Sequence, residues 1–260
     1  MALGGILAGG AAQAEEQPFR PFVFTVTTTQ VPGSERWSVH YDAGYAERTA
    51  TPFGYGGVEQ RVGVQGALGS GFTVLGQLGL GLDTGNGQST SIMQEAEILK
   101  DLLGPSRGLQ LATGLGVRRE WQGTTALLGR VSLGHVFAGS SLFGNLRFER
   151  PLAEGRDGVD LITSIGWLFR VGSALHLGLE TIGEDFEGFW EAEEAEGGAK
   201  LFVGPSAHLT SANRRLYASL CGGPIFYATR SGRTSGAPRP LGGSGSGNGY
   251  TLRLSVGYGF

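Results

Sequence analysis

Hydrophobic and polar side chains alternate along most of the chain from about residue 35 onward. The last eleven residues, 250–260, are the clearest case, because every second side chain is large and apolar and those between are polar or small. Residues 158–170 and 173–183 repeat the pattern. A period of two puts successive side chains on opposite faces of a β-strand. The sequence therefore predicts an all-β protein whose strands each have one apolar face.

The alternating stretches and the turn residues between them divide the chain into twelve candidate strands, most of them 10–13 residues long. Strands of globular proteins usually have about 5–6 residues, whereas a tilted strand needs about 9–11 to cross a bilayer. The expected strands are 35–45, 57–68, 71–82, 91–102, 108–120, 124–137, 141–150, 158–170, 173–184, 198–210, 214–228 and 248–260.

The connections between these strands alternate in length. Every even-numbered connection is short, and the odd-numbered ones include all the long ones, although the fifth, near residues 121–123, is tight. Short turns on one rim and long loops on the other are typical of outer-membrane barrels, with the turns in the periplasm and the loops outside the cell. An even count also returns both termini to the periplasm. We predict a closed, antiparallel, up-and-down transmembrane β-barrel of about 12 strands over residues 35–260.

One strand assignment has an alternative. Residues 91–102 are rich in Glu, Ala and Leu, which suit a helix equally well. Residues 22–29 have strand composition, and using them while making 91–102 a helix again gives twelve strands. We favour a strand at 91–102, because deleting it alone breaks the even count.

The first fourteen residues are uncharged and apolar, and they end in Ala12-Gln13-Ala14 before two glutamates. An apolar core before a small-residue cleavage site is typical of a signal peptide. A complete signal peptide begins with Lys or Arg, so we expect the true start to lie upstream; the alternative is an apolar arm of the mature protein. Residues 15–34 are expected to form a periplasmic N-terminal segment.

Composition excludes several other classes. Glycine supplies 48 of the 260 residues but has no three-residue period, so the chain is not collagen-like. One cysteine forms neither a disulfide framework nor a multi-thiolate zinc site, and a net charge of −3 with scattered Lys and Arg gives no footprint for nucleic acid. No uncharged apolar run approaches the roughly 18–20 residues of a membrane helix. In a closed, curved barrel, dense glycine allows the strands to bend.

The C-terminal strand, Arg253-Leu-Ser-Val-Gly-Tyr258-Gly-Phe260, resembles the terminal signal of Gram-negative outer-membrane β-barrel proteins, although Ser255 stands where that family usually has glycine. Residues 29–37 resemble the opening of porin-like and transporter barrels of the phenol-degradation-pathway type. The resemblance implies the cell outer membrane, contact with lipid and lipopolysaccharide, and recognition by the barrel-assembly machinery. It implies no particular function. The assembly-signal residues would be Arg253, Ser255, Tyr258 and Phe260.

If the polar strand faces line the lumen, charges of both signs are interleaved there. Opposed Arg and carboxylate groups would form a wet, weakly selective pore or pair into ladders that close it. The predicted lumen-lining residues are Arg61, Arg118, Glu120, Arg130, Arg147, Glu149, Asp160, Arg170, Glu180 and Arg253, with Arg36, Asp42, Glu59, Arg215, His40, His176 and His208 on the same faces.

An acidic loop is the most unusual local feature. Its carboxylates would repel anions, bind divalent cations of the lipopolysaccharide layer or favour cationic solutes at the mouth; the alternative is a solvated extracellular loop. It contains Glu184, Asp185, Glu187, Glu191, Glu193, Glu194 and Glu196, with Phe186, Phe189 and Trp190 interspersed.

We therefore predict a small passive, porin-like pore for small solutes, without enzyme activity, cofactor, metal site or nucleic-acid partner. The alternative is a non-conducting structural or surface-interaction barrel. A lipid-modifying enzyme is the outside alternative, because some outer-membrane barrels use a His and Ser pair on the lipid face. The only comparable cluster, Ser206, His208 and Thr210, faces the lumen by alternation, and outward-facing His135 has no Ser two residues along.

Overall fold

The structure, a computed structural model, describes residues 20–27, 37–47, 52–83, 90–103, 109–121, 123–137, 139–152, 159–184, 199–227 and 248–260. These residues form twelve strands and almost no other regular structure. The strands are β1 (Trp37–Glu47), β2 (Gly57–Gly69), β3 (Phe72–Leu82), β4 (Thr90–Asp101), β5 (Leu109–Arg119), β6 (Thr125–Phe137), β7 (Ser140–Pro151), β8 (Asp160–Arg170), β9 (Leu175–Glu184), β10 (Lys200–Thr210), β11 (Leu216–Tyr227) and β12 (Gly249–Gly259).

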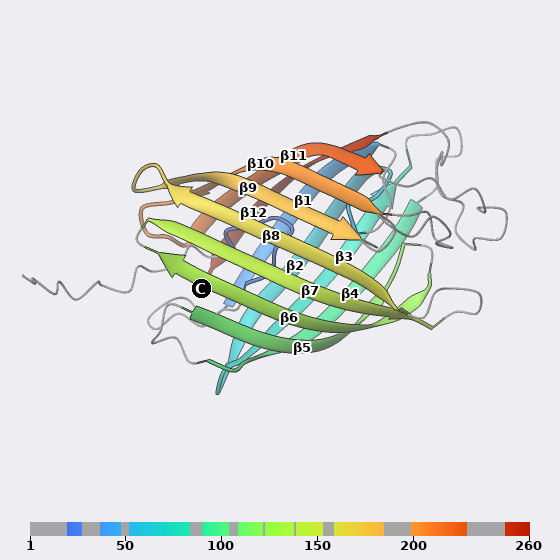
Figure 1. The fold of residues 1–260 in the computed structure, drawn as a ribbon, viewed down its shortest axis with the longest axis horizontal. Coiled ribbons are helices and arrows are strands. Elements are labelled where there is room, and N and C mark those ends of the chain that lie inside the picture. Colours follow the sequence, from blue (N-terminus) through green and yellow to red (C-terminus); the bar gives the residue numbers. More distant parts are fainter. Residues whose placement is uncertain are drawn as a thin grey trace, which may run out of the picture.

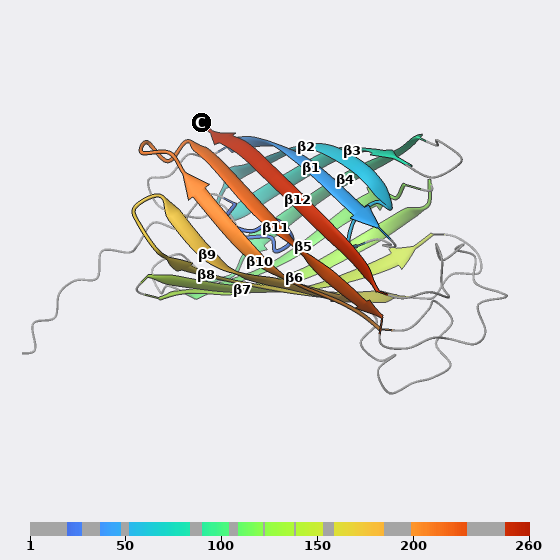
Figure 2. The same ribbon diagram turned by 90° about the horizontal axis from the view of Figure 1, so that it is seen from above.

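Each strand pairs antiparallel with its neighbours in the chain, and β1 pairs with β12 to close the barrel (Figures 1 and 2). At this seam the Trp37 N–H donates to the Phe260 carbonyl at 3.1 Å, and the Phe260 N–H donates to the Trp37 carbonyl at 2.8 Å. The predicted twelve-stranded, up-and-down barrel is confirmed.

The structure also decides between the two strand assignments. Residues 90–101 form β4, which pairs with β3 along its whole length and with β5 from Gln94 onward. Residues 22–27 belong to no strand. The strand at 91–102 is therefore confirmed, and the alternative that used 22–29 is wrong for its described residues.

Large apolar side chains cover the outside of the barrel. Leu115 is 71% exposed, Leu78 61% and Val62 58%, whereas the side chains that alternate with them point inward and are mostly polar or small. Among the described residues, no helix has the length and apolar character to cross a membrane. An apolar outer belt around a closed sheet is the arrangement that satisfies both the backbone and the hydrocarbon of a bilayer.

The two ends of the barrel differ. At the turn rim, where β1 begins and β12 ends, the even-numbered connections are short; the longer connections lie at the opposite loop rim. Figure 1 shows the C-terminus at the turn rim. The turn between β2 and β3 has positive φ at Gly69, Ser70 and Gly71 (90°, 49° and 81°), which explains glycine on both sides of Ser70.

Residues 20–27, the inner segment, lie inside the barrel, as the blue trace within the ring of strands shows (Figures 1 and 2). We expected residues 15–34 to form a periplasmic N-terminal segment, and this assignment stays a prediction. Phe22 and Val23 are only 1% and 6% exposed, because they are buried against apolar lumen side chains. The signal peptide at 1–14 lies outside the described residues and stays a prediction.

Candidate functional site

The lumen has two chemically different halves. From β7 to β11 its wall carries a group of buried apolar side chains, including Phe143, Ile162 and Phe202. From β12 through β1 to β7 it carries arginines and carboxylates instead. The inner segment lies between these halves, because it makes contacts with both.

Phe22 anchors one end of the inner segment in the apolar half. Its ring packs against Phe143, with ring centroids 5.8 Å apart, and shares a cluster with Leu168. Gly166 makes room for it: a Cβ at that position would lie 2.4 Å from Phe22 Cδ1, well inside van der Waals contact. Glycine is thus required on this lumen face of β8 by the presence of the segment.

Val23 and Phe24 fill the next part of the apolar half. Val23 belongs to a buried cluster, and Phe24 packs on that cluster with its ring 5.0 Å from the ring of Phe202. The guanidinium of Arg253 also packs over the Phe24 ring, with its Cζ 4.7 Å from the ring centroid. Phe24 therefore bridges the apolar and charged halves. The cluster around Val23 contains Phe53, Ile162, Ile182, Phe202, Cys221 and Ile225.

The Glu180 carboxylate holds the middle of the inner segment. It accepts hydrogen bonds from three successive backbone N–H groups, those of Val23 at 3.0 Å, Phe24 at 2.7 Å and Thr25 at 3.3 Å. Glu180 itself is 1% exposed. Convergent N–H groups are a suitable environment for a buried carboxylate, and a carboxylate satisfies backbone donors that have no ladder partner.

Side chains of four other strands hold the rest of the segment. Asn145 exchanges two hydrogen bonds with Val26, and the Gln65 side chain donates to the Thr27 carbonyl at 2.9 Å. Arg20 pairs with Asp42 through two bonds of 3.1 and 2.9 Å, while Ser219 donates to the Arg20 carbonyl at 3.3 Å. Every one of these anchors is a wall side chain, so the segment is docked in the barrel and not woven into its ladder.

The contacts also give the direction of the segment. Thr27 meets β2 and Arg20 meets β11 toward the turn rim, since Gln65 lies near the end of β2 and Ser219 near the start of β11. Phe24 instead meets Phe202, near the loop-rim end of β10. The inner segment is therefore a bend whose two ends face the turn rim and whose middle reaches deepest.

The charged half is a network of buried ion pairs. Arg130 donates two hydrogen bonds to the Glu97 carboxylate, of 2.8 and 2.6 Å. Arg147 pairs with Glu95 at 2.7 Å and with Glu149 at 2.8 Å. Arg118 pairs with Glu149 and, at 3.1 Å, with a second carboxylate, that of Glu120. Each arginine therefore shares carboxylates with its neighbours, and the network crosses β4 to β7 continuously.

A second group of charges surrounds the seam. Glu59 pairs with Arg61 at 2.9 Å and also with Arg253 of β12. Together with the Arg20–Asp42 pair, the network among the described residues has six arginines and six carboxylates, so its formal charges cancel. Its members are Arg20, Arg61, Arg118, Arg130, Arg147, Arg253, Asp42, Glu59, Glu95, Glu97, Glu120 and Glu149.

Nine of the ten predicted lumen-lining residues lie on the inner face, and the tenth is Arg170. Arg170 belongs to the inward-facing set of alternating residues but is exposed at the turn rim, because β8 ends there. Arg215, which directly precedes β11 at the same rim, is also exposed. Arg36 lies outside the described residues. The nine inward residues are Arg61, Arg118, Glu120, Arg130, Arg147, Glu149, Asp160, Glu180 and Arg253.

The expected acidic loop also needs a correction. Glu184 is not a loop residue but ends β9, where it is 2% exposed and pairs with Lys200 of β10 at 2.6 Å. Opposite charges in register on adjacent strands make this a cross-strand pair. The other acidic residues of that loop, Asp185, Glu187, Glu191, Glu193, Glu194 and Glu196, lie outside the described residues.

Sequence reasoning missed four charged residues of the lumen: Arg20, Glu95, Glu97 and Lys200. Glu95 and Glu97 share the inward face of β4 with Met93 and Leu99, a period of two that marks them as lumen residues once 91–102 is read as a strand. No comparable signal existed for Arg20, because the inner segment belongs to no strand.

Space remains inside the lumen beside the inner segment. A cavity of about 110 Å³ is lined by Val23, Phe24 and Val26 of the segment and by charged, polar and apolar side chains of the wall. A second cavity, of about 60 Å³, lies against β1–β4. Arg20, Val23 and Val26 line both cavities, so the inner segment forms part of the wall of each.

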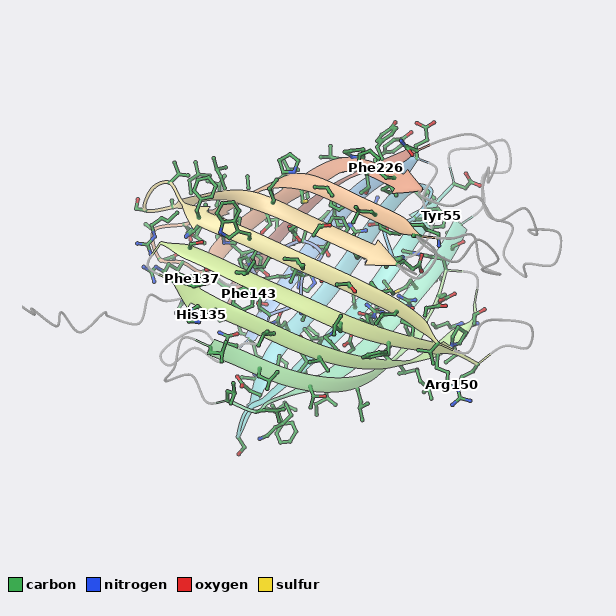
Figure 3. The ribbon with its side chains drawn as sticks, in the orientation of Figure 1. Tyr55, His135, Phe137, Phe143, Arg150 and Phe226 are labelled. Carbon is green, nitrogen blue, oxygen red and sulfur yellow. The ribbon has the colours of Figure 1, made fainter. Side chains whose placement is uncertain are left out.

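The histidines and the cysteine serve packing in this arrangement. His208 is fully buried, and its Nδ1 lies 2.7 Å from Ser219 Oγ, the same hydroxyl that bonds to the Arg20 carbonyl. His135 lies on the outside beside Phe137 (Figure 3), with ring centroids 4.3 Å apart. Cys221 is buried and free. Within the described ranges, no group of three or more His, Cys, Asp or Glu is placed to hold a metal ion.

The apolar belt and the closed, twelve-stranded sheet define the fold of a bacterial outer-membrane β-barrel protein. The fold is similar to that of the NanC porin, with a TM-score of 0.57 and 8% sequence identity over 85% of this chain and 100% of that chain. It is also similar to the KdgM porin, with a TM-score of 0.55 and 11% identity over 86% and 99%. KdgM in complex with disordered oligogalacturonate gives a TM-score of 0.54 and 12% identity, over 86% and 99%.

No family model matches the sequence, and no curated protein sequence matches it either. The resemblance of residues 29–37 to the phenol-degradation-pathway type therefore stays an expectation. At these levels of identity, the likeness to the porins concerns the fold.

Proposed function

We propose that this protein is an outer-membrane channel for small polar solutes, narrowed by its own inner segment. The cavity of about 110 Å³ beside that segment carries the proposal. Its lining includes the ion-paired Arg61, Arg118 and Arg147, whose charged groups are compatible with water in the lumen.

The charge balance of the wall predicts weak ion selectivity. The neighbouring KdgM structure holds oligogalacturonate, a polyanion, but each arginine of this lumen already has a carboxylate partner. The six cations and six anions of the network cancel, and the inward carboxylates Asp160 and Glu180 outside it add only a small excess of negative charge, so the net field on a solute is weak. We therefore propose small polar solutes of either charge as the substrates.

Planar-bilayer recording of the refolded protein tests the proposal. Step-like currents are expected, with a reversal potential close to zero in a KCl gradient. Silence at every voltage and salt concentration, from protein shown to be folded by its heat-modifiable mobility on a gel, would overturn it.

A second candidate, a non-conducting structural barrel, is favoured by the packing of the inner segment. Phe22, Val23 and Phe24 bring apolar bulk into the lumen, and Glu180, Asn145 and Gln65 hold it there. The same recording decides between the candidates, because a structural barrel gives no current under any condition.

We propose no enzymatic activity. The His208–Ser219 pair lies on the lumen face, is buried to 0% and 2% exposure, and is covered by the Arg20 carbonyl. His135, on the outer face, contacts an aromatic ring. Phospholipid and lipopolysaccharide hydrolysis assays on the wild type and on His208→Ala and His135→Ala should show no activity; hydrolysis by the wild type that either variant lacks would refute this part of the proposal.

A further inference from the structure

The inner segment occupies a site built for it. The charged and polar groups that receive it, Glu180, Asn145 and Gln65, are each less than 5% exposed and come from three different strands. Gly166 leaves the space that the Phe22 ring fills. A wall that provides hydrogen-bond acceptors for successive N–H groups, donors for carbonyls and a recess for an aromatic ring has the properties of a peptide-binding site.

The same contacts show that the segment can leave without dismantling the barrel. None of residues 20–27 belongs to a strand, and the twelve ladders close without them. Glu180, Asn145 and Gln65 are polar side chains that water can satisfy in place of the backbone. Because both ends of the bend face the turn rim, withdrawal toward that rim crosses no strand.

From these observations, and resting on the channel function proposed above, we propose that residues 20–27 are a releasable plug: docked in the peptide site they narrow the lumen, and released they widen it. The two cavities that share Arg20, Val23 and Val26 as lining would then join into one passage. The remaining wall keeps its Arg and carboxylate pairs on one side and its apolar cluster on the other.

Two variants release the plug in different ways. Deletion of residues 20–27 removes it, and Gly166→Leu places a side chain where the Phe22 ring lies, so that an intact segment cannot dock. Gly144→Ala is the matched control on the neighbouring strand, because a Cβ there meets its nearest atom at an ordinary 3.5 Å. Apart from the stated deletion or substitution, each variant keeps the rest of the chain, and its barrel formation is checked by heat-modifiable mobility on a gel.

Single-channel recording is the readout. We expect both plug variants to conduct several-fold more than the wild type, and Gly144→Ala to match the wild type. A synthetic peptide with the sequence of residues 20–27 should block the deletion variant when added on the turn-rim side. A scrambled peptide should leave the current unchanged, and Glu180→Gln in the deletion background should weaken the block several-fold.

The outcomes separate the plug from the channel. If the wild type and both folded plug variants conduct equally, the plug proposal is wrong and the channel stands. If the folded variants are silent at all voltages, the channel function is wrong and the plug falls with it. If one plug variant does not fold, the conductance of the other, compared with the wild type, still tests the plug. Addition of the peptide to that variant tests the docking site, because a conductance that the peptide does not reduce contradicts it.

Discussion

Asn145 and Val26 exchange two hydrogen bonds across the lumen: the Val26 N–H donates to Asn145 Oδ1 at 2.7 Å, and Asn145 Nδ2 donates to the Val26 carbonyl at 2.9 Å. One side chain thus imitates the backbone of a neighbouring strand. It gives a segment outside the sheet the two bonds that a ladder would provide. The same Oδ1 also receives Arg130 Nη1 at 3.3 Å, which ties the inner segment to the ion-pair network.

Replacing Asn145 by Leu should destabilise the folded barrel. The N–H and carbonyl of Val26 would lose their partners, at a cost of about 1–3 kcal/mol for each buried group left without one. Urea unfolding of the protein in detergent, followed by tryptophan fluorescence, measures the change. Asn145→Asp keeps the acceptor for the N–H and should lose less; equal stability of Leu and wild type would show that water replaces the side chain.

Removing the charge of Glu97 should also lower the free energy of unfolding. Glu97→Gln leaves Arg130, which is 4% exposed, without its two-bonded carboxylate. Breaking a buried pair on one side typically costs about 3–5 kcal/mol. The double variant Glu97→Gln with Arg130→Met should recover part of this loss. Arg150→Met, at the exposed loop-rim end of β7 (Figure 3), is the matched control and should change the unfolding free energy little.

The ion selectivity of the channel should shift with single charges of the network. Arg118→Met leaves the network with one carboxylate in excess, and the reversal potential should move toward the equilibrium potential of K⁺. Glu120→Gln leaves the network with one arginine in excess, and the reversal potential should move toward the equilibrium potential of Cl⁻. Measurements in a tenfold KCl gradient compare the two variants directly. Identical reversal potentials would mean that ions do not pass this part of the wall.

A charge on the outer belt should reveal the depth of each position in the membrane. Leu115, in the middle part of β5, is 71% exposed on the outer face. Leu115→Arg should lower the unfolding free energy in lipid vesicles by about 2–4 kcal/mol, as expected near the bilayer midplane, and Leu109→Arg at the turn rim of the same strand by about 0–1. Similar losses at both positions would contradict a membrane-spanning β5 in which Leu115 lies deeper in the bilayer than Leu109.

The sequence predicted the barrel because every strand carries the same local signal. The exposed Tyr250, Leu252 and Leu254 and the buried Thr251 and Arg253 follow the alternation seen in the chain. The strand at 91–102 was the hardest to assign, because its Glu and Ala residues favour a helix when considered alone. Its pairing with β3 and β5 overrides that preference.

The docking of the inner segment could not be predicted in this way. Its partners are distant in the chain: Arg20 and Ser219 are 199 residues apart, and Val23 and Glu180 are 157 apart. The barrel wall did give a sequence signal for this docking: Ile182 and Phe202 point into a lumen that was otherwise expected to be polar. Inward apolar residues in a barrel wall indicate that something apolar covers them.

The closed seam between β1 and β12 also constrains the order in which the molecule is completed. A ring without a free edge admits a peptide only through its ends, and the inner segment is a bend that opens toward the turn rim. It can thus enter an already sealed ring, leading with Val23 and Phe24. Residues 20–27 are synthesised before every strand, but this geometry allows them to dock after the last strand has closed the ring, so the order of folding need not follow the order of synthesis.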